Sequence, residues 1–229
     1  MNLSIRLKAI VDLIDEKASV ADIGTDHGYI PIYLMENKLA SKVIASDINK
    51  GPIDIAIKNL KEHNITLGVE TRLGPGLKTL SKGEVDVAII AGMGGNLIAS
   101  ILEDSIDIAK EFNYIILQPA QHQEVLRKYL YESGFKIITE KVVFDSDKYY
   151  HTMKVTKGND TQYENEVHYY TGRGELNTRS NDFKGYINEK IKSMEKIIKY
   201  TAKSEDKSRY EYLSNLIKEF KEVKREYDL

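Results

Sequence analysis

A short glycine-bearing segment near the N-terminus limits the possible folds of this chain more than any other feature. Residues 20–29 read Val-Ala-Asp-Ile-Gly-Thr-Asp-His-Gly-Tyr, so Asp22, Gly24, Asp26 and Gly28 stand at alternate positions. A short β-branched run precedes this pattern, and an apolar stretch over residues 29–35 follows it. This order is typical of a strand that turns directly into a helix.

An acidic residue closes the next strand-like run, residues 42–47, and completes a known unit. Strand, glycine turn, helix, strand and acid form the mononucleotide-binding half of a Rossmann-type sheet. In such a unit Asp47 would accept hydrogen bonds from the hydroxyls of a ribose. The pattern therefore predicts a ligand that contains a nucleoside, and a tight turn without any ligand is the alternative.

The turn departs from the dinucleotide fingerprint G-x-G-x-x-G where that fingerprint makes room for a pyrophosphate. Counted from Gly24, the second and third glycines would stand at positions occupied by Asp26 and Tyr29. A carboxylate there would repel a pyrophosphate but would suit a ligand with positive charge. S-adenosylmethionine has a sulfonium, an amino group and no phosphate, so we expect it as the cofactor. An NAD-dependent oxidoreductase is correspondingly disfavoured.

Strand and helix signals alternate through the first two thirds of the chain. The predicted strands are residues 19–24, 42–47, 69–73, 85–91, 114–118, 136–144 and 149–156. Helical patterns lie between them at residues 53–62, 77–80, 96–111 and 123–133. Short β-branched runs separated by helices predict a parallel sheet covered on both faces, and the last two strands predict an antiparallel hairpin. This α/β arrangement matches the seven-stranded Rossmann-like sheet of class I methyltransferases.

The chain changes character after residue 157. Residues 158–181 are polar and contain glycines, which indicates a linker. Residues 182–228 repeat apolar side chains at helical spacing, with a helix-start signal at residues 204–206, and predict a coiled hairpin of two antiparallel helices. We therefore expect a methyltransferase domain over residues 1–157, and a linker with a C-terminal helical hairpin over residues 158–229. The lysine-rich hairpin either contacts RNA or presents a solvated face.

Composition excludes several classes of protein. The net charge of -2 gives no bulk polycation, and the absence of cysteine excludes disulfides and thiol-bound metal. Charged residues interrupt the apolar positions of residues 1–20, which predicts an amphipathic helix rather than a signal peptide. No apolar run is long enough to span a bilayer. We expect a soluble cytoplasmic protein without metal, and a monomer.

Two further segments stand at predicted strand ends. Residues 90–95, Ile-Ala-Gly-Met-Gly-Gly, end the fourth strand, and Gln118 ends the fifth. Ligands of open α/β sheets bind at this carboxyl edge, and glycines there allow close approach to the backbone. A plain tight loop is the alternative for the glycines. Gln118 either hydrogen-bonds a base or caps its strand.

Together these segments resemble the bacterial tRNA (adenine-N1)-methyltransferases of the TrmK family, which modify adenine 22 in the D-arm. The matching motifs are D-I-G-T-D-H-G-Y-I-P-I, S-D-I-N-K-G-P, I-A-G-M-G-G and L-Q-P, within about residues 3 to 156. The resemblance implies transfer of a methyl group from S-adenosylmethionine to N1 of adenine 22 in tRNA. It also implies these cofactor-binding residues: Asp22, Gly24, Thr25, Asp26, Gly28, Asp47, Ile48, Gly74, Gly76, Gly92, Met93 and Gly94.

The chain differs from the family pattern at two positions. Pro75 replaces the acid usual between Gly74 and Gly76, so a contact to the cofactor's adenine amino group would come from the backbone or be missing. Ala120 replaces the asparagine usual after Gln118-Pro119, which removes any catalytic role of that side chain.

The candidate catalytic residues are Asp26, His27 and Gln118. Methylation at N1 places positive charge on the adenine ring, and the Asp26 carboxylate would stabilise it. Binding the amino group of the cofactor is the competing role for Asp26. His27 would relay the lost proton, contact RNA or cap the turn, and Tyr29 would stack on the base or pack in the core.

Other readings stay open. Arg6 and Lys8 would contact phosphate or lie on a solvated face. A methyltransferase for a small molecule or a protein would share residues 22–47. A non-catalytic module that binds S-adenosylmethionine or RNA would use the helical hairpin as its interaction surface.

Overall fold

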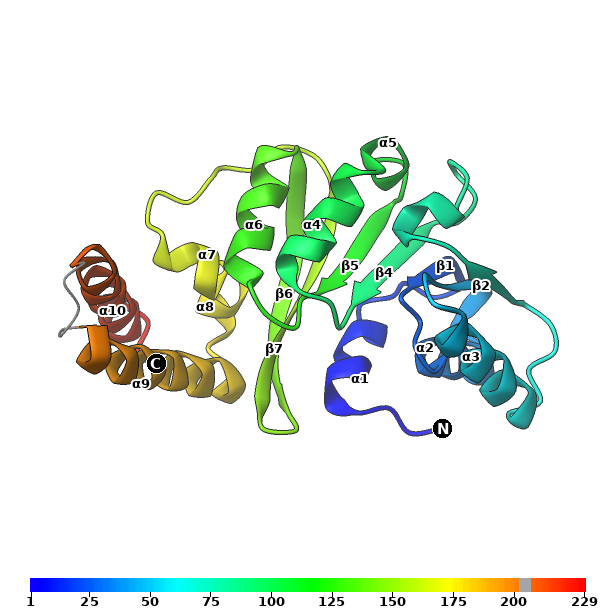
Figure 1. The fold of residues 1–229 in the computed structure, drawn as a ribbon, viewed down its shortest axis with the longest axis horizontal. Coiled ribbons are helices and arrows are strands. Elements are labelled where there is room, and N and C mark those ends of the chain that lie inside the picture. The colour runs from blue at the N-terminus through cyan, green and yellow to red at the C-terminus, as the bar shows by residue number, and fades with distance from the viewer. Residues whose placement is uncertain (202–206) are drawn as a thin grey trace.

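The centre of the computed structural model, which describes residues 1–201 and 207–229, is a seven-stranded sheet in the order β3-β2-β1-β4-β5-β7-β6 (Figure 1). The strands are β1 (Ala18–Ile23), β2 (Ala40–Asp47), β3 (Val69–Leu73), β4 (Val87–Ala91), β5 (Tyr114–Gln118), β6 (Phe135–Asp145) and β7 (Lys148–Lys157). The first five are parallel, whereas β7 is antiparallel to β5 and β6. All seven predicted strands and the Rossmann-like sheet are confirmed.

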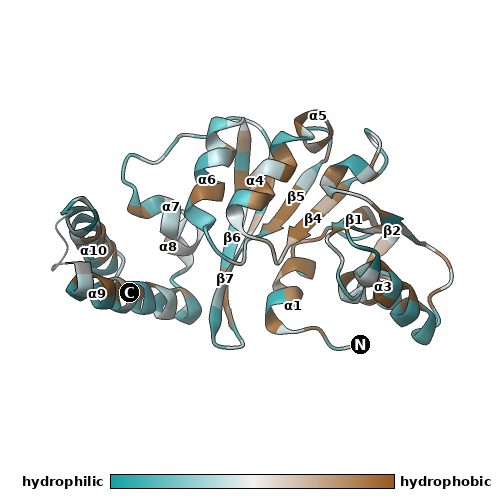
Figure 2. Cartoon of the chain, in the orientation of Figure 1, coloured by the Kyte–Doolittle hydropathy of each residue, from teal (hydrophilic) through white to brown (hydrophobic). Residues whose placement is uncertain are grey.

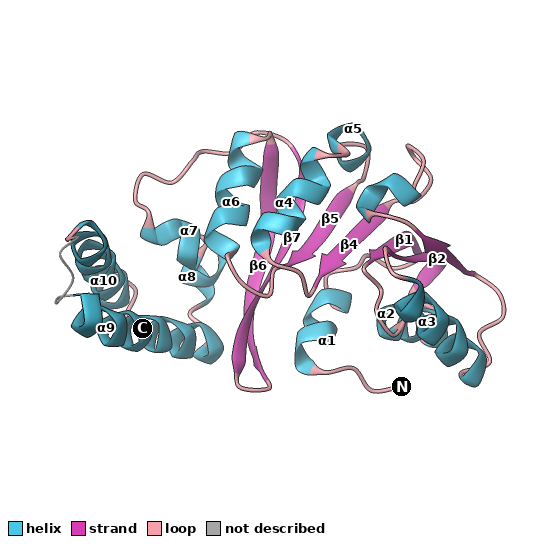
Figure 3. Cartoon of the chain, viewed as in Figure 1, coloured by secondary structure: helices cyan, strands magenta, loops and turns pink. Residues whose placement is uncertain are grey.

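Helices connect and cover the strands (Figure 3). They are α1 (Ile5–Val11), α2 (Tyr29–Glu36), α3 (Lys50–Glu62), the 3-10 turn η1 (Gly76–Thr79), α4 (Gly95–Glu103), α5 (Ile106–Ala109), α6 (Gln123–Glu132), α7 (Val167–Thr171), α8 (Gly174–Thr178), α9 (Asn181–Thr201) and α10 (Ser208–Glu226).

Three predicted boundaries are wrong. The N-terminal helix covers Ile5–Val11 rather than most of residues 1–20, because residues from Ala18 onward pair with β2 and β4. The helix predicted over residues 96–111 is two helices, since Ser105 leaves the helical conformation with φ -141°. The predicted linker contains α7 and α8, and α7 is held by burial of Val167 and Thr171. The helix start predicted at residues 204–206 lies outside the described residues.

Alternating side chains of the strands form a core on each face of the sheet. Val20, Val43 and Ile89 pack with α1 and α2 on one face. Ala21 and Ile90 pack with α4 and α6 on the opposite face. Figure 2 shows the corresponding apolar colour along the central strands. Helices on both faces are what the continuous apolar strands predict, because a parallel sheet buries both of its faces.

The C-terminal helices α9 and α10 pack together beside the β6–β7 end of the sheet (Figure 1). Lys221 donates to Glu195 at 2.6 Å, and Lys224 donates to Asn188. Later residues of α10 thus meet earlier residues of α9, so the two helices are antiparallel as predicted. Their supercoiling stays a prediction.

The strand order defines where a ligand would bind. After β1 the chain moves in one direction to β2 and β3, and then in the other direction to β4 and β5. Crossover loops diverge at such a switch point and leave a crevice at the carboxyl ends of the strands. The carboxyl ends of β1 and β4 are followed by residues 24–28 and 92–94.

Candidate cofactor-binding site

The turn after β1 has the backbone conformation that its glycines suggested. Gly24, Asp26 and Gly28 have φ values of 76°, 51° and 73°. A Cβ at Gly24 would lie 2.2 Å from the Met93 methyl carbon, so a larger residue there would displace the end of Met93 and would also be strained by the positive φ. A Cβ at Gly28 would lie 3.2 Å from the Ala56 Cβ of α3. Gly28 therefore serves the packing of α2 on α3.

The loop after β4 is bound to the loop after β5. Gly92 N donates to Gln118 O at 3.0 Å, and Gly95 N donates to Gln121 O at 2.8 Å. Ala120 N donates to Met93 O at 2.8 Å, so Ala120 contributes through its backbone. These hydrogen bonds fix the position of Met93 at the switch point.

Two cavities of about 270 and 320 Å³ lie side by side at this edge of the sheet. Both are lined by Gly24, Asp47 and Met93, so Met93 stands between them. Small-molecule sites of proteins enclose roughly 300–1,000 Å³. The pair therefore offers an elongated site for one ligand with two chemically different ends.

The first cavity is largely apolar. Ile48 and Leu97 line it although their side chains are 65% and 53% exposed, which places large apolar groups at its mouth. Asp47 accepts a hydrogen bond from Asn49 N at 2.8 Å, so the Asp47 side chain is fixed where β2 ends. Apolar walls beside a fixed carboxylate suit a planar base with an attached ribose.

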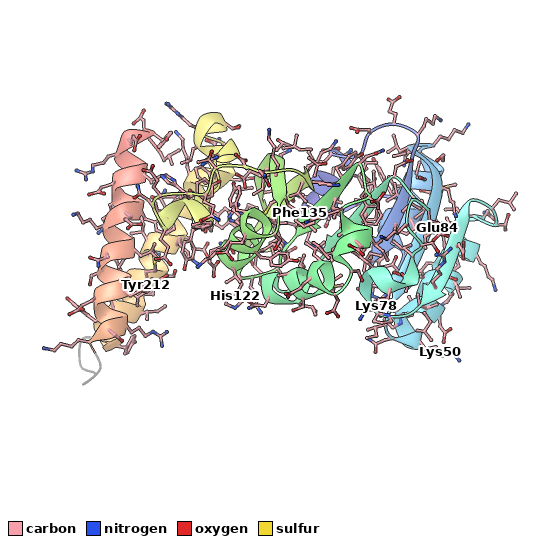
Figure 4. The ribbon with its side chains drawn as sticks, turned by 90° about the horizontal axis from the view of Figure 1, so that it is seen from above. Lys50, Lys78, Glu84, His122, Phe135 and Tyr212 are labelled. Atoms are coloured by element: carbon pink, nitrogen blue, oxygen red, sulfur yellow. The ribbon has the colours of Figure 1, made fainter. Side chains whose placement is uncertain are left out.

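An arginine on β3 holds one wall of the first cavity in place. Arg72 donates to Thr79 O at 2.7 Å and to Glu84 at 2.8 Å, which closes the loop that begins at Gly74 and Gly76. The hydrogen bond from Arg72 lowers the pKa of Glu84 to about 2. Figure 4 shows Glu84 and Lys78 at the same end of the molecule. The ion pair of Arg72 with Glu84 thus holds in place the cavity wall to which Gly74 and Gly76 belong.

The second cavity has carboxylates. Asp22 is 4% exposed, and burial raises its pKa to about 6, with further contributions from the negative charges of Asp47 and Asp26. A buried carboxylate beside two other acids favours a cationic ligand, because positive charge would compensate the desolvated negative charge. The sulfonium and amino group of S-adenosylmethionine fit this end, and its nucleoside fits the apolar end.

The candidate catalytic residues occupy different places. Asp26, Tyr29 and Arg6 line the second cavity, and Asp26 is largely exposed there. His27 Nε2 lies 3.5 Å from Asp26 Oδ2, and the His27 ring stacks on Tyr29 with centroids 5.3 Å apart. His27 is not among the residues lining this cavity, but it contacts Asp26 and Tyr29, which both line it.

Gln118 does not line either cavity. Its side chain is fully buried, and its amide nitrogen donates to Arg6 O at 2.9 Å and to Thr152 Oγ1 at 2.8 Å. This geometry favours the alternative of a strand-end cap, which here ties α1 to β5 and β7. Lys8 also stays outside the cavities and pairs with Asp12 at 2.6 Å.

Most residues expected at the cofactor do line the cavities. The structure brings together Asp22, Gly24, Thr25, Asp26, Asp47, Ile48, Gly74, Gly76, Gly92 and Met93. Gly28 and Gly94 line neither cavity. Sequence reasoning missed the face of α4 that includes Leu97, Ile101 and, just beyond the helix, Asp104. Their three- and four-residue spacing is the signal that could have found them.

Within residues 1–201 and 207–229, no group of three histidine, aspartate or glutamate side chains is arranged to hold a metal ion. In the same residues no helix combines the length and apolar character needed to cross a membrane.

Comparison with known proteins gives consistent results. Residues 3–153 match the methyltransferase domain family. The tRNA (adenine(22)-N(1))-methyltransferase of Bacillus subtilis is 37% identical over 158 residues, which cover 69% of this chain and 66% of that protein. The crystal structure of the B. subtilis m1A22 tRNA methyltransferase TrmK superimposes with a TM-score of 0.87 at 29% identity, over 97% of this chain and 98% of TrmK. A Streptococcus pneumoniae protein in complex with S-adenosyl-L-methionine gives a TM-score of 0.88 at 28% identity, over 97% and 99%.

Proposed function

Because this chain belongs to the methyltransferase domain family and, within it, to the TrmK family of tRNA methyltransferases, we propose that it transfers a methyl group from S-adenosylmethionine to N1 of adenine 22 in tRNA. The observation that carries this proposal is the pair of adjoining cavities at the switch point, one apolar and one lined by carboxylates. The two ends complement the nucleoside and the cationic methionyl part of this cofactor.

In the proposed complex each end of the cofactor has its own partners. Asp47 accepts hydrogen bonds from the ribose hydroxyls, and Ile48 and Leu97 enclose the adenine. Asp104 lines the same cavity and supplies the carboxylate that Pro75 lacks, as an acceptor for the adenine amino group. Asp22 balances the positive charge of the methionyl part, and Met93 packs across the middle of the ligand.

The chain's task in catalysis is mainly positioning. S-adenosylmethionine, when bound, supplies an electrophilic methyl group on its sulfonium. Holding two reactants in line contributes as much as roughly 7–11 kcal/mol in favourable intramolecular systems. N1 lies on the pairing edge of adenine, so the base must leave its stack to reach the second cavity, at a cost of a few kcal/mol. Tyr29, at the exposed mouth of that cavity, stacks on the extruded base.

Two residues act on the charge and the proton of the target base. The Asp26 carboxylate stabilises the positive charge that develops on the ring after alkylation at N1. The methylated ring has a more acidic amino group, and His27 Nε2, 3.5 Å from Asp26, accepts its proton. Binding the amino group of the cofactor is the second role open to Asp26, because it lines the same cavity as Asp22.

The proposed division of the chain separates the two cores of the sheet from a third core around α9 and α10, which Val142 of β6 also joins. Residues 1–157 form the methyltransferase domain, and residues 158–229 form the C-terminal helical part. We further infer that the protein acts in the cytoplasm, where its tRNA substrate is found, and that it acts as a monomer. Light scattering in solution would check the last point.

The test is methyl transfer from radiolabelled S-adenosylmethionine to unmodified bulk tRNA, with the product mapped after nuclease digestion. We expect N1-methyladenine in the D-arm. Transfer to a protein or a small molecule, but not to tRNA, would contradict the proposed substrate. Cofactor binding without transfer to any acceptor would indicate a binding module. Binding of tRNA should weaken as salt is added, because phosphate contacts release counterions.

Asp26→Asn is the variant that isolates the charge at this position. Asparagine tolerates the left-handed conformation of Asp26, φ 51°, whereas alanine would add backbone strain. We expect a fall in kcat of about tenfold or more when the carboxylate acts on the developing charge. An increased Kd for S-adenosylmethionine with an unchanged kcat would assign Asp26 to cofactor binding instead. Asp54→Asn, an exposed acid on α3, is the matched control.

A further inference from the structure

A groove of about 410 Å³ lies between the methyltransferase domain and α9, separate from both cofactor cavities. Its walls come from the loop after β5, the start of α6, β7, α7 and α9, and include Gln121, Tyr149, His151, Tyr170, Tyr186 and Lys190. Figure 4 shows His122, which also lines the groove, between the end formed by α9 and α10 and the end that holds the first cofactor cavity.

One wall of the groove has a buried hydrogen-bond donor without an acceptor. His151 is 3% exposed, and its Nδ1 lies 3.0 Å from the Arg127 guanidinium. Burial lowers the pKa of His151 far below its usual value, and the charge of Arg127 lowers it further. The neutral ring accepts from Arg127 at Nδ1 and thus carries its proton on Nε2. Nε2 has no hydrogen-bond partner among the described residues, is shielded from solvent, and belongs to a ring that meets the Tyr186 ring edge to face with centres 4.5 Å apart.

Arg127 is itself held firmly, so the His151 ring is fixed. Arg127 pairs with Glu140 at 2.9 Å, and both side chains are almost fully buried. Arg127 also donates to Tyr169 O at 2.7 Å. Unpaired buried donors are rare in proteins and disfavoured, which makes an orphaned donor in a groove wall a candidate contact for a ligand.

Aromatic rings form much of the remaining wall. Tyr186 is fixed by hydrogen bonds with Gln123 at 2.9 Å and with Tyr170 O at 3.2 Å. Lys190 Nζ lies 5.0 Å from the centre of the Tyr170 ring, and burial lowers the pKa of Lys190. Tyr149 is partly exposed at the edge of the groove. Tyrosine rings beside fixed polar groups are the usual setting for an unstacked base.

The charges in the groove select a base over a phosphate. Lys148 and Lys190 are balanced by Glu124 and Glu189, which also line the groove. A phosphate would meet these two carboxylates, whereas a neutral base would use the rings and, after a shift of the Tyr186 ring, the unpaired Nε2 donor. The groove is also connected to the cofactor cavities. Ala120 lines the groove, and its backbone N donates to the backbone O of Met93, which lines both cavities.

We propose that this groove binds an unpaired nucleobase of the RNA substrate, from a nucleotide other than the methylated adenine. The base stacks against Tyr149 and Tyr170 and accepts a hydrogen bond from His151 Nε2, while Lys190 closes the groove. This inference rests on the proposed function, because it requires RNA as the substrate. Occupation of the groove would fix the RNA relative to the loop that holds Met93.

The test compares paired variants in tRNA methylation and in tRNA binding. Lys190→Met removes the ammonium from the groove, and Lys192→Met removes one from the exposed side of the same helix. A groove site predicts that Lys190→Met raises KM and Kd for tRNA about tenfold. Lys192→Met should change both by less than about twofold, since exposed charges are screened. The Kd for S-adenosylmethionine should be unchanged in both.

His151→Asn is the second variant, because asparagine can still accept from Arg127 but lacks the Nε2 donor. We expect it to raise KM for tRNA about tenfold, with kcat unchanged. Equal effects of Lys190→Met and Lys192→Met would indicate bulk electrostatics and would overturn the groove site. An unchanged KM for tRNA in Lys190→Met would also overturn it. Both results can be obtained even if His151→Asn fails to fold. A wild-type protein that methylates no tRNA would refute the proposed function itself, which is a separate outcome.

Discussion

Replacing Asp22 by asparagine tests the electrostatics of the proposed cofactor site most directly. Asp22 is almost completely buried between β2 and β4, and burial raises its pKa from 3.8 to about 6. One pKa unit corresponds to 1.36 kcal/mol, so keeping this carboxylate ionised costs about 3 kcal/mol of folding free energy above pH 6. Asparagine has nearly the same shape and no charge.

The sign of the pH dependence follows from the direction of the shift. Between about pH 4 and pH 6 the native state binds more protons at Asp22 than the unfolded chain does. The free energy of unfolding therefore falls as pH rises through this window and is not changed further by Asp22 above it. The free energy of unfolding of the wild type, measured relative to that of Asp22→Asn, should therefore fall between pH 4 and pH 6. At pH 8 the variant should exceed the wild type by as much as about 3 kcal/mol.

The Asp22→Asn change should also weaken the binding of S-adenosylmethionine. Without the carboxylate, the cationic end of S-adenosylmethionine loses a charge-assisted contact of about 1.5–3 kcal/mol, or roughly tenfold or more in Kd. In the wild type the affinity should fall as pH drops below 6 and Asp22 becomes protonated. Titration calorimetry at pH 5 and pH 8 measures both effects.

Urea unfolding of cofactor-free protein at pH 4.5, 6 and 8 gives the stability difference, with Asp54→Asn as an exposed control. Lower stability of Asp22→Asn at pH 8 would refute the account of a desolvated carboxylate without a compensating positive charge. Retention of the wild-type slope between pH 4 and 6 in Asp22→Asn would refute it as well.

Three further changes probe other parts of the structure. Gly95→Ala would place a Cβ 2.1 Å from His122 O, so we expect a loss of about 1–3 kcal/mol in urea unfolding, and an unchanged midpoint would contradict this close contact. Glu140→Gln leaves the buried charge of Arg127 unpaired and should cost about 3–5 kcal/mol. Adding Arg127→Met to Glu140→Gln should recover part of that loss; calorimetric melting would show whether it does. Ile48→Ala should raise the Kd for S-adenosylmethionine about fivefold with little change in Tm, because this exposed side chain contributes apolar area to the ligand rather than to the core.

Local patterns were sufficient to predict the framework of this protein. Every strand was found from β-branched runs, because strand propensity and turn residues act over a few positions. The left-handed turn followed from Gly24 and Gly28, since glycine adopts positive φ readily. The acid at the end of β2 and the glycines after β4 were placed at the site because parallel strands end at a common edge.

Other features were decided only by tertiary packing. The burial that raises the pKa of Asp22, the attachment of Gln118 to α1 and the approach of α4 to the first cavity all depend on which elements lie side by side. The ion pair of Arg127 with Glu140 and the orphaned donor of His151 join residues from α6, β6 and β7. Sequence spacing does not encode such contacts, because desolvation and hydrogen bonding are set by neighbours in space rather than along the chain.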